Sequence, residues 1–187
     1  MNKNKITETL GQYSVQPIKL ADIEHIRVWR NEQMSVLRQK TMITQEEQRN
    51  YFEKKVFPEY EKEQPFQIIY SFLMNDELIG YGGLVHISWH DLRVEMSFLV
   101  HPKRANNLDV YRNDFKNFIS LTKKIVFENF AFNRIHVETY AFRDEHIKVL
   151  EESGFILEGR ARQHVIEEGN FQDSLIHGFI RSEYEGI

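Results

Sequence analysis

The feature that constrains the fold most is a long amphipathic segment between two short alternating segments. Residues 111–130 carry an apolar stripe with a period of about 3.6 residues, which predicts a helix. In residues 93–100 polar and apolar side chains alternate, and the same period of two recurs in residues 134–140, which predicts two strands. Because a helix that crosses from one strand to the next makes them parallel, we expect one parallel pair here.

The first of these strands carries a carboxylate in its middle. Arg93, Glu95 and Ser97 share one face, and the apolar side chains share the other. Pro102 follows the strand and ends it, since proline has no N–H for the ladder. A carboxylate placed beside a core makes Glu95 a candidate for proton transfer. The alternative is a half-exposed carboxylate that pairs with Arg93 or with a cation on a neighbouring strand.

Composition excludes several classes of protein and of site. The chain has 187 residues, 41% of them hydrophobic, which is enough for one domain with a sizeable core. It has no cysteine, which excludes disulfides, thiolate metal sites and cysteine nucleophiles, and its histidines lack tight metal-ligand spacing, so no metal is expected. A net charge of −4 argues against a general nucleic-acid binder. Without an apolar signal core or an apolar run of about 18 residues, we expect a cytoplasmic protein that does not enter a membrane.

The rest of the chain adds helices and hairpin-connected strands. Thr44 and Glu47 have the spacing of a capping box, and Asp144 and Gly154 are the predicted N-cap and C-cap of a later helix. The pattern predicts a single α/β (α+β) domain, with a mixed, mostly antiparallel sheet of six to seven strands and helices on both faces. The other predicted segments are a frayed stretch at 1–12, a strand at 14–19, helices at 20–30 and 44–56, and strands at 66–73, 77–87, 155–159, 163–167 and 171–180.

Short motifs in the second half of the chain carry a family resemblance. They are Asn-Arg-Ile at 133–135, Ile-Lys-Val-Leu-Glu-Glu-Ser-Gly-Phe at 147–155 and Glu-Gly-Arg at 158–160. With the order of elements over about residues 14–180, they resemble the GNAT superfamily of acetyl-CoA-dependent N-acetyltransferases, and within it the branch of ribosomal-protein N-terminal acetyltransferases. The resemblance implies a GNAT-like fold and acetyl-CoA as cosubstrate.

Other motifs are similar to a different branch, the acetyltransferases of nucleotide-linked amino sugars in surface-glycan pathways. They are Trp-Arg-Asn at 29–31, Gly-Tyr-Gly-Gly-Leu at 80–84 and Asp-Ser-Leu-Ile-His-Gly at 173–178. We therefore expect an amino sugar carried on a nucleotide as acceptor. The N-terminal amine of a protein is the second acceptor hypothesis, and a non-catalytic GNAT-like binding domain is the alternative of another class. Exposed strand edges favour a homodimer.

Three positions depart from the family pattern. The segment 100–109 has no glycine, although the family's pyrophosphate loop is glycine-rich, so Lys103 and Arg104 are the candidates to supply charge to the phosphates. Arg143 stands where the family often has an asparagine that touches the pantetheine arm. Leu150 stands where many members have a tyrosine general acid, so another group or water must protonate the leaving thiolate.

The resemblance also implies direct attack of the acceptor amine on the thioester. The carbonyl is expected to bind backbone N–H groups at Phe98, Leu99 and Val100, where the strand bulges from its parallel neighbour. An amine arrives as an ammonium and needs a base. Glu95 is the first candidate and Glu138 the second, with a salt bridge as the alternative role of Glu138.

Five further side chains are candidates for the remaining roles. His146 or Tyr140 would protonate the thiolate, and the alternative for both is packing in the interior. Trp29 would stack on a base or sugar, Arg30 would meet a phosphate, and His86 and Glu138 would line the acceptor site. The alternative for Trp29 and Arg30 is a core side chain and a helix end.

Overall fold

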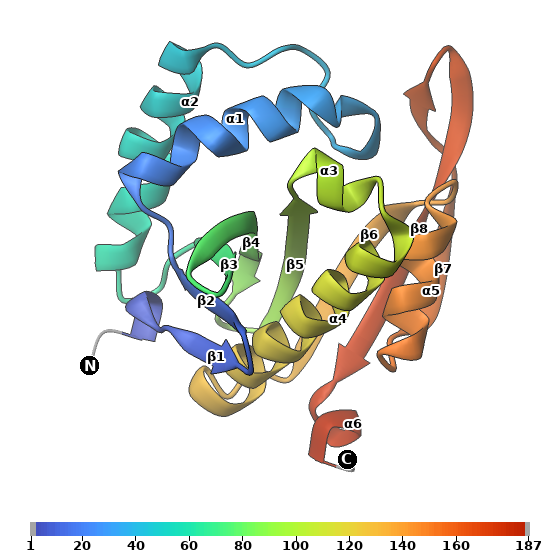
Figure 1. Cartoon of the computed structure of the whole chain (residues 1–187). Helices are drawn as coiled ribbons and strands as arrows, with labels where there is room; N and C mark the ends of the chain where they lie inside the picture. The colour runs from blue at the N-terminus through green and yellow to red at the C-terminus, as the bar shows by residue number, and fades with distance from the viewer. Residues whose placement is uncertain (1–2, 186–187) are drawn as a thin grey trace.

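The structure, a computed structural model, describes residues 3–185 and is built around one eight-stranded sheet (Figure 1). The strand order is β1-β2-β3-β4-β5-β6-β8-β7, and neighbours are antiparallel except for the parallel pair of β5 and β6. The strands are β1 (Glu8–Leu10), β2 (Tyr13–Pro17), β3 (Ile68–Met74), β4 (Glu77–Ser88), β5 (Arg93–Val100), β6 (Arg134–Tyr140), β7 (Ile156–Glu167) and β8 (Asn170–Ile180).

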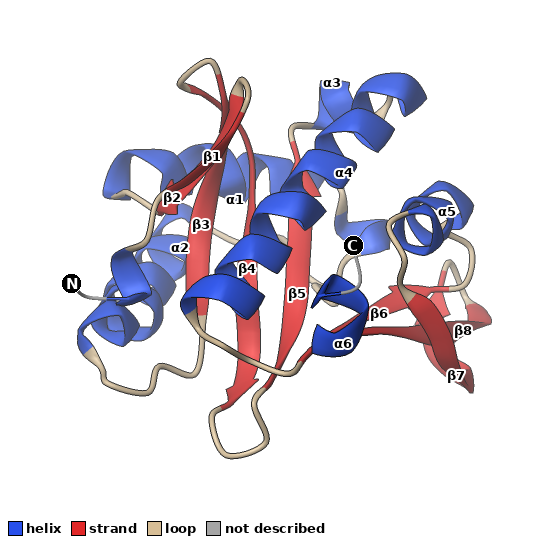
Figure 2. Ribbon diagram, turned by 90° about the horizontal axis from the view of Figure 1, so that it is seen from below, coloured by secondary structure: helices blue, strands red, loops and turns tan. Residues whose placement is uncertain are grey.

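Helices cover both faces of the sheet, with α1 and α2 opposite α4 (Figure 2). The helix α4 connects β5 to β6, which makes that pair parallel, as the sequence predicts. The α-helices are α1 (Ile23–Glu32), α2 (Gln45–Tyr51), α3 (Pro102–Ala105), α4 (Leu108–Lys124), α5 (Asp144–Glu152) and α6 (Arg181–Glu185). Short 3-10 turns are at Lys3–Lys5, Leu20–Asp22, Met34–Val36 and Phe57–Glu61, and π-helical turns at Phe52–Val56 and Ile125–Asn129 extend α2 and α4.

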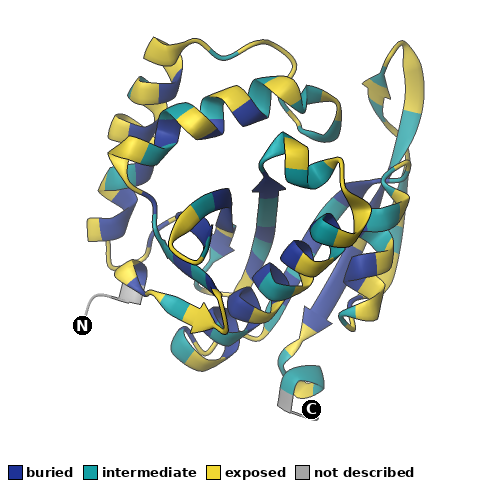
Figure 3. Ribbon diagram, in the orientation of Figure 1, coloured by how far each residue is buried: buried dark blue, intermediate teal, exposed yellow. Residues whose placement is uncertain are grey.

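Aromatic side chains fill the layer between α4 and the sheet, and the ribbon of α4 accordingly alternates between buried and more exposed residues (Figure 3). The ring of Phe98 on β5 stacks on Phe115 of α4 at 4.5 Å, and Phe72 on β3 meets Phe118 of the same helix edge-on at 5.3 Å. Burying one such ring contributes about 1.5–3 kcal/mol, so this layer holds the helix firmly across the strands. The predicted apolar stripe of 111–130 is therefore packed as expected.

Several predicted details are confirmed. The bounds of β5 and β6 are those predicted from the alternation. Separately from these predictions, no helix among the described residues is long and apolar enough to cross a membrane. The capping box is present: Glu47 N donates to Thr44 Oγ1 at 3.2 Å and Thr44 N donates to Glu47 Oε2 at 2.8 Å. Gly154 takes the predicted left-handed conformation, with φ of +86°, although the C-cap of α5 is Ser153, one residue before the predicted one.

The prediction of a frayed N-terminus is wrong for residues 3–12, and residues 1–2 lie outside the described part. Strand β1 pairs with β2 and adds the eighth strand to a sheet predicted to have six to seven. Asn4 is buried and donates to Lys62 O at 2.6 Å. Ile6 belongs to the core. Tertiary contacts therefore order a segment whose polar composition suggests disorder.

Two predictions at the C-terminal end also need correction. The closing segments 155–159 and 163–167 form one strand, β7, because the ladder to β8 continues past a register shift between Ala161 and Val165. In that bulge Gln163 has φ of +50° and its N–H donates to Asp173 Oδ1 at 2.8 Å. The N-cap of α5 is Arg143, and Asp144, the predicted cap, lies in the first turn, where its charge favours the helix N-terminus.

Candidate active site between two diverging strands

The parallel strands β5 and β6 separate halfway along their length. Their ladder consists of the register pairs Arg93–Arg134, Val94–Ile135 and Glu95–His136 in the described chain. Beyond Glu95 the C-terminal half of β5 continues to pair only with β4. A gap therefore opens between β5 and β6 at the level of residues 96–100.

Three cavities meet at this gap, and Phe98 lines all of them. A cleft of about 570 Å³ lies between α1, the β5–α4 connection and α5, and we call it the α4–α5 cleft. A pocket of about 520 Å³ lies among α1, α2, β3 and β4, and we call it the α1–α2 pocket. A smaller cavity of about 220 Å³ contains Glu95 and Glu138 and shares lining residues with both. Two spaces large enough for ligands thus connect beside an ionisable group.

The backbone at Phe98 and Val100 faces the gap. The carbonyls of Ser97 and Leu99 lie against Gly82 and Gly80 of β4, and backbone groups of successive strand residues point to alternate sides. A Cβ on Gly80 would lie only 2.7 Å from Leu99 O, which explains why a close strand pair has glycine here. The N–H groups of Phe98 and Val100 consequently point away from β4, toward the space that β6 has left.

Glu95 stands at the last position of β5 that pairs with β6, and its carboxylate accepts two hydrogen bonds. Arg38 Nη2 lies 2.8 Å from Glu95 Oε1, and His86 Nδ1 donates to Glu95 Oε2 at 2.7 Å. The same Arg38 Nη2 lies 2.9 Å from Glu138 Oε2 on β6. The two carboxylates that the sequence singles out are therefore brought together, and a loop arginine, which sequence reasoning missed, joins them.

His86 reaches Glu95 because β4 bulges at this point. The ladder to β5 shifts register between Val85 and Ser88, and His86 takes φ of +49°. Its ring lies edge-on to Phe66 at 5.5 Å. A positive φ is costly for a residue other than glycine, and such positions cluster at functional sites. The bulge aims the imidazole at the carboxylate.

His136 faces the same carboxylate from β6. It is the register partner of Glu95, and its Nδ1 is buried without a hydrogen-bond partner among the described residues. Burial lowers the pKa of His136, although the charge of Glu95 opposes this shift. No role was predicted for His136 from the sequence.

Inside the α4–α5 cleft, His146 is packed rather than exposed. Its ring stacks on Phe115 at 4.2 Å, Tyr111 Oη lies 2.6 Å from its Nδ1, and Arg143 Nη2 donates to Nδ1 at 3.3 Å. Burial, with the positive charge of Arg143, holds the pKa of His146 well below its ordinary value. A neutral ring whose Nδ1 accepts is a weak proton donor, so the predicted acid role of His146 has little support from this geometry.

Similarity to known proteins agrees with this arrangement. The family description "Acetyltransferase (GNAT) domain" matches residues 15–176. This chain belongs to that family. The GNAT fold and an acyltransferase domain therefore follow for most of the chain.

Individual relatives are more distant. The SPbeta prophage-derived uncharacterized N-acetyltransferase YokL of Bacillus subtilis (strain 168) is 27% identical over 70 residues, which span 37% of this chain and 40% of that protein. Spermidine N-acetyltransferase from Vibrio cholerae, solved with CoA and spermine, superposes with a TM-score of 0.80 at 16% identity over 94% of this chain and 99% of that one. A dodecameric structure of the Vibrio enzyme superposes with a TM-score of 0.76 at 15% identity, covering 94% and 97%. At such identities the structural likeness concerns the fold.

The glycine-free turn of this GNAT domain is fixed by side chains. His101 caps α3 by accepting from Lys103 N at 3.0 Å. Arg104 donates to both carboxylate oxygens of the buried Asp114, at 2.6 and 2.8 Å, and Tyr13 donates to the same carboxylate at 3.0 Å. Neither Lys103 nor Arg104 lines the α4–α5 cleft. The guanidinium of Arg104 neutralises Asp114, so the phosphate role predicted for Arg104 conflicts with its position.

The donor set of the cleft nevertheless fits an acyl-CoA. Arg143, which the sequence singled out, and Lys148 both line it and can meet phosphates. Apolar side chains of Val36 and Leu108 can flank a pantetheine arm. The N–H groups beside the gap supply donors for a thioester carbonyl. In the described residues no group of three or more histidine or acidic side chains is placed to hold a metal ion.

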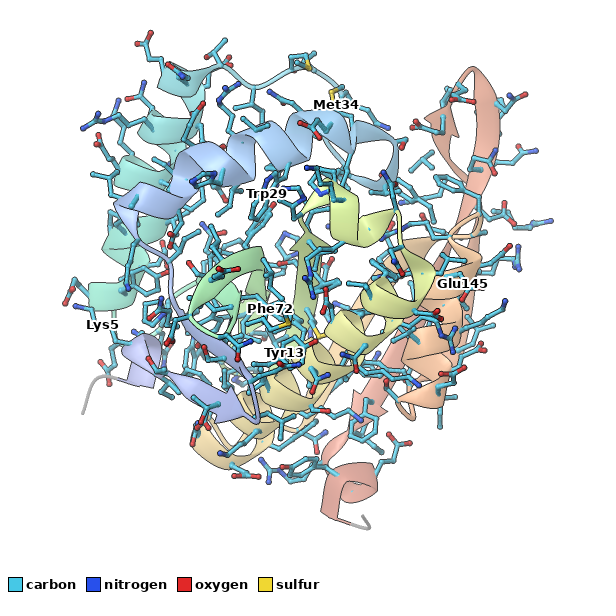
Figure 4. All side chains as sticks on the ribbon, in the orientation of Figure 1. Lys5, Tyr13, Trp29, Met34, Phe72 and Glu145 are labelled. Carbon is cyan, nitrogen blue, oxygen red and sulfur yellow. The ribbon has the colours of Figure 1, made fainter. Side chains whose placement is uncertain are left out.

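The predicted acceptor residues of this GNAT domain are only partly at the gap. Trp29 projects from α1 into the interior (Figure 4) and is 6% exposed. The centroid of its ring lies 5.1 Å from that of His101, and it lines none of the three cavities, so it is a core residue. Arg30 lines the α1–α2 pocket but donates to Tyr81 Oη at 2.7 Å and Gln39 Oε1 at 3.0 Å. The predicted stacking role of Trp29 is thus contradicted by its burial.

Two tyrosines present hydroxyl groups near the gap. Tyr140 lines the small cavity and donates to Leu37 O at 3.3 Å, and burial raises its pKa. Tyr111 lines the α4–α5 cleft, and burial raises its pKa although Arg143 opposes the shift. Sequence analysis counted Tyr111 as core packing; its position in the first turn of α4, directly after the turn that follows β5, is the signal that could have identified it.

Proposed function

We propose that this protein is an acetyl-CoA-dependent N-acetyltransferase whose acceptor is a small aliphatic amine with more than one positive charge, the class to which polyamines belong. The observation that carries this proposal is the pair of carboxylates, Glu95 and Glu138, where the two large cavities meet. An ammonium group is the natural partner of such a pair. The α1–α2 pocket adds the apolar side chains of Ile26, Met42 and Phe52, which suit a methylene chain.

The proposed reaction is a direct transfer. Acetyl-CoA occupies the α4–α5 cleft, and the N–H groups of Phe98 and Val100 stabilise the oxyanion. Glu95, directly or through one water, takes a proton from the ammonium, whose nitrogen then attacks the carbonyl carbon. The C–S bond breaks, and the thiolate takes a proton from a hydroxyl group of the cleft or from water. The nitrogen of the new amide then loses its remaining extra proton to the oxyanion that this donor has become, so that the only net proton released is the one on Glu95.

Two tyrosine hydroxyl groups are candidates to donate the proton to the thiolate. Tyr140 is the donor predicted from the sequence, and Tyr111 is the one that the cleft adds. Replacing each with phenylalanine and comparing kcat at saturating substrates separates them. The donor is the tyrosine whose loss lowers kcat without a matching rise in KM.

The same geometry disfavours the nucleotide-linked amino sugar that the sequence motifs suggest. That acceptor needs an aromatic side chain to stack on and a free cation for its phosphates. Trp29 is buried and Arg30 already has two partners. The superposed Vibrio enzymes are named spermidine N-acetyltransferases, which agrees with a polyamine but, at 16% identity, adds support only through the fold.

The deciding experiment measures CoA thiol release from acetyl-CoA with a panel of acceptors. Spermidine and spermine represent the proposed class, a nucleotide-linked amino sugar and a peptide with a free N-terminus represent the rivals, and Glu95→Gln is the matched inactive control. We expect turnover with the polyamines that exceeds turnover with the rivals at least tenfold. Turnover confined to the sugar nucleotide or peptide would overturn the acceptor class, and a melting shift with acetyl-CoA but no turnover of any acceptor would leave a binding domain.

We also propose that the protein forms a homodimer through the exposed hairpin of β7 and β8. The edge strand β7 and its partner expose Ile156, Ile166 and Phe171, which are 57, 56 and 64% accessible. An unpaired edge with apolar side chains favours association. Light scattering of the native chain and of a Phe171→Glu variant tests this, and a wild-type monomer at all concentrations would contradict it.

A further inference from the structure

One guanidinium group bridges the two strands where they have separated. Arg38 Nη2 lies 2.8 Å from Glu95 Oε1 on β5 and 2.9 Å from Glu138 Oε2 on β6. The side chains of Glu95 and Glu138 are 12% and 24% exposed, whereas that of Arg38 is 49% exposed. The carboxylates are thus largely enclosed, and the cation that satisfies them enters from the solvent side.

Arg38 stands on a segment that is tied at its ends and irregular between them. Leu37 O accepts from Tyr140 Oη at 3.3 Å. Asn31 holds the other end, donating to Ile43 O and accepting from Ile43 N, both at 2.9 Å. Residues 37–43 lie outside helices and strands. Arg38 can therefore leave the carboxylates without breaking an element of secondary structure.

The two carboxylates are where the proposed acceptor must place its ammonium. We propose that Arg38 is an internal competitor for the acceptor: its guanidinium occupies the carboxylate pair in the free enzyme, and an acceptor ammonium displaces it. This inference rests on the proposed function and makes Arg38 a residue that sets acceptor affinity. A neutral molecule can donate hydrogen bonds to the carboxylates but cannot replace the positive charge of Arg38, so the competition favours cations.

If the contact between Arg38 and Glu95 had a different role, removing Arg38 would have the opposite effect on the kinetic constants. If Arg38 only positioned Glu95 for proton transfer, its removal would lower kcat or raise KM for the acceptor. An internal competitor, in contrast, raises the apparent KM of the wild-type enzyme, because only the fraction with Arg38 displaced can bind. The expected effect is a three- to tenfold change in KM, which corresponds to about 0.7–1.4 kcal/mol and is of the size that two half-exposed ion pairs contribute.

The test uses Arg38→Ala with spermidine as the probe. We expect KM for spermidine to fall about three- to tenfold while kcat stays within twofold, and added guanidinium chloride at low millimolar concentration to restore the higher KM as a competitive inhibitor. Arg38→Lys, which keeps the charge, is expected to retain the wild-type KM. Lys40→Ala, on the same segment but 3.7 Å from Glu167 instead, is the matched control and is expected to change neither constant.

A binding measurement separates this inference from the proposed function. Calorimetry of spermidine without acetyl-CoA is expected to show tighter binding to Arg38→Ala than to wild type, and no binding to the Glu95→Gln/Glu138→Gln double variant. If spermidine binds in this order but is never acetylated, the proposed function fails and the competition stands. Weaker or unchanged binding by Arg38→Ala, an unchanged or raised KM, or no binding to either form at millimolar spermidine would overturn the competition.

Discussion

The two sides of the β5–β6 gap differ in the exposure and the charge of their titratable side chains. On the acceptor side, Glu95 and Glu138 are ionisable groups whose cation, Arg38, comes from a half-exposed loop. On the cofactor side, Tyr111 of α4 and His146 are buried, the ring of His146 stacks on Phe115 of the same helix, and burial keeps the imidazole neutral. The acceptor side is built to exchange one cation for another, and the cofactor side to hold a fixed shape. Substitutions should accordingly change the kinetic constants on the first side and the free energy of unfolding on the second.

The largest expected effect is on catalysis at the acceptor side. Glu95→Gln removes the proposed base, and loss of general base catalysis typically costs about 10²–10⁴ in rate. We expect kcat/KM to fall about a thousandfold with the free energy of unfolding nearly unchanged. Glu138→Gln, which loses one contact to Arg38 but no proposed proton transfer, should change the rate tenfold at most. A Glu95→Gln variant with full rate from pH 6 to 9 would show that another group is the base.

The second largest effect is on stability, and it comes from the buried ion pair of Arg104 and Asp114. Asp114→Asn leaves Arg104 beside a neutral, completely buried partner, and breaking such a pair costs about 3 kcal/mol in the free energy of unfolding. Urea denaturation measures the loss. Asp109→Asn, in the exposed first turn of the same helix, is the control and should lose less than about 1 kcal/mol. Equal losses in the two variants would contradict the structural role of Asp114.

A third prediction concerns the pH dependence of stability. It tests whether the buried imidazole of His146, on the cofactor side, is neutral. In the native state the pKa of His146 is well below its usual value, so below about pH 6.5 the unfolded state binds a proton that the native state does not. Stability is therefore lost as the pH falls. Between pH 8 and 5 the wild type should lose about 2 kcal/mol more than His146→Gln. The exposed His164→Gln is the control, and a wild-type loss no larger than that of His146→Gln would contradict a neutral buried imidazole.

The smallest effect is the loss of one hydroxyl group. Tyr111→Phe removes the partner of His146 Nδ1 and leaves Arg143 as its only donor among the described residues. We expect a loss of about 1 kcal/mol in the free energy of unfolding. Tyr51→Phe, whose hydroxyl bonds Gln67 at an exposed site, should be close to neutral. A loss in Tyr111→Phe no greater than that in Tyr51→Phe would show that the buried contact adds no stability.

Sequence patterns predicted the parts of this molecule that depend on local periodicity. The alternation around Glu95 gave the bounds of β5, and the motif near Gly154 gave the end of α5. Strand β1 was missed because its order comes from pairing with β2, not from its own residues. Arg38 was missed for a similar reason, since a loop side chain reaches its partners through the fold and 57 residues separate it from Glu95.

The pair of Arg104 and Asp114 has a consequence for ligand binding beside it. With Tyr13 it fixes the turn between β5 and α4 without glycine, so the segment is already ordered in the free protein. Ordering the backbone of one flexible residue costs about 1–2 kcal/mol of conformational entropy. In this chain the turn loses its conformational entropy when the protein folds. A mobile glycine-rich turn would lose it when the ligand binds, which would weaken binding. A substitution that frees Arg104 should therefore weaken a ligand that it never touches.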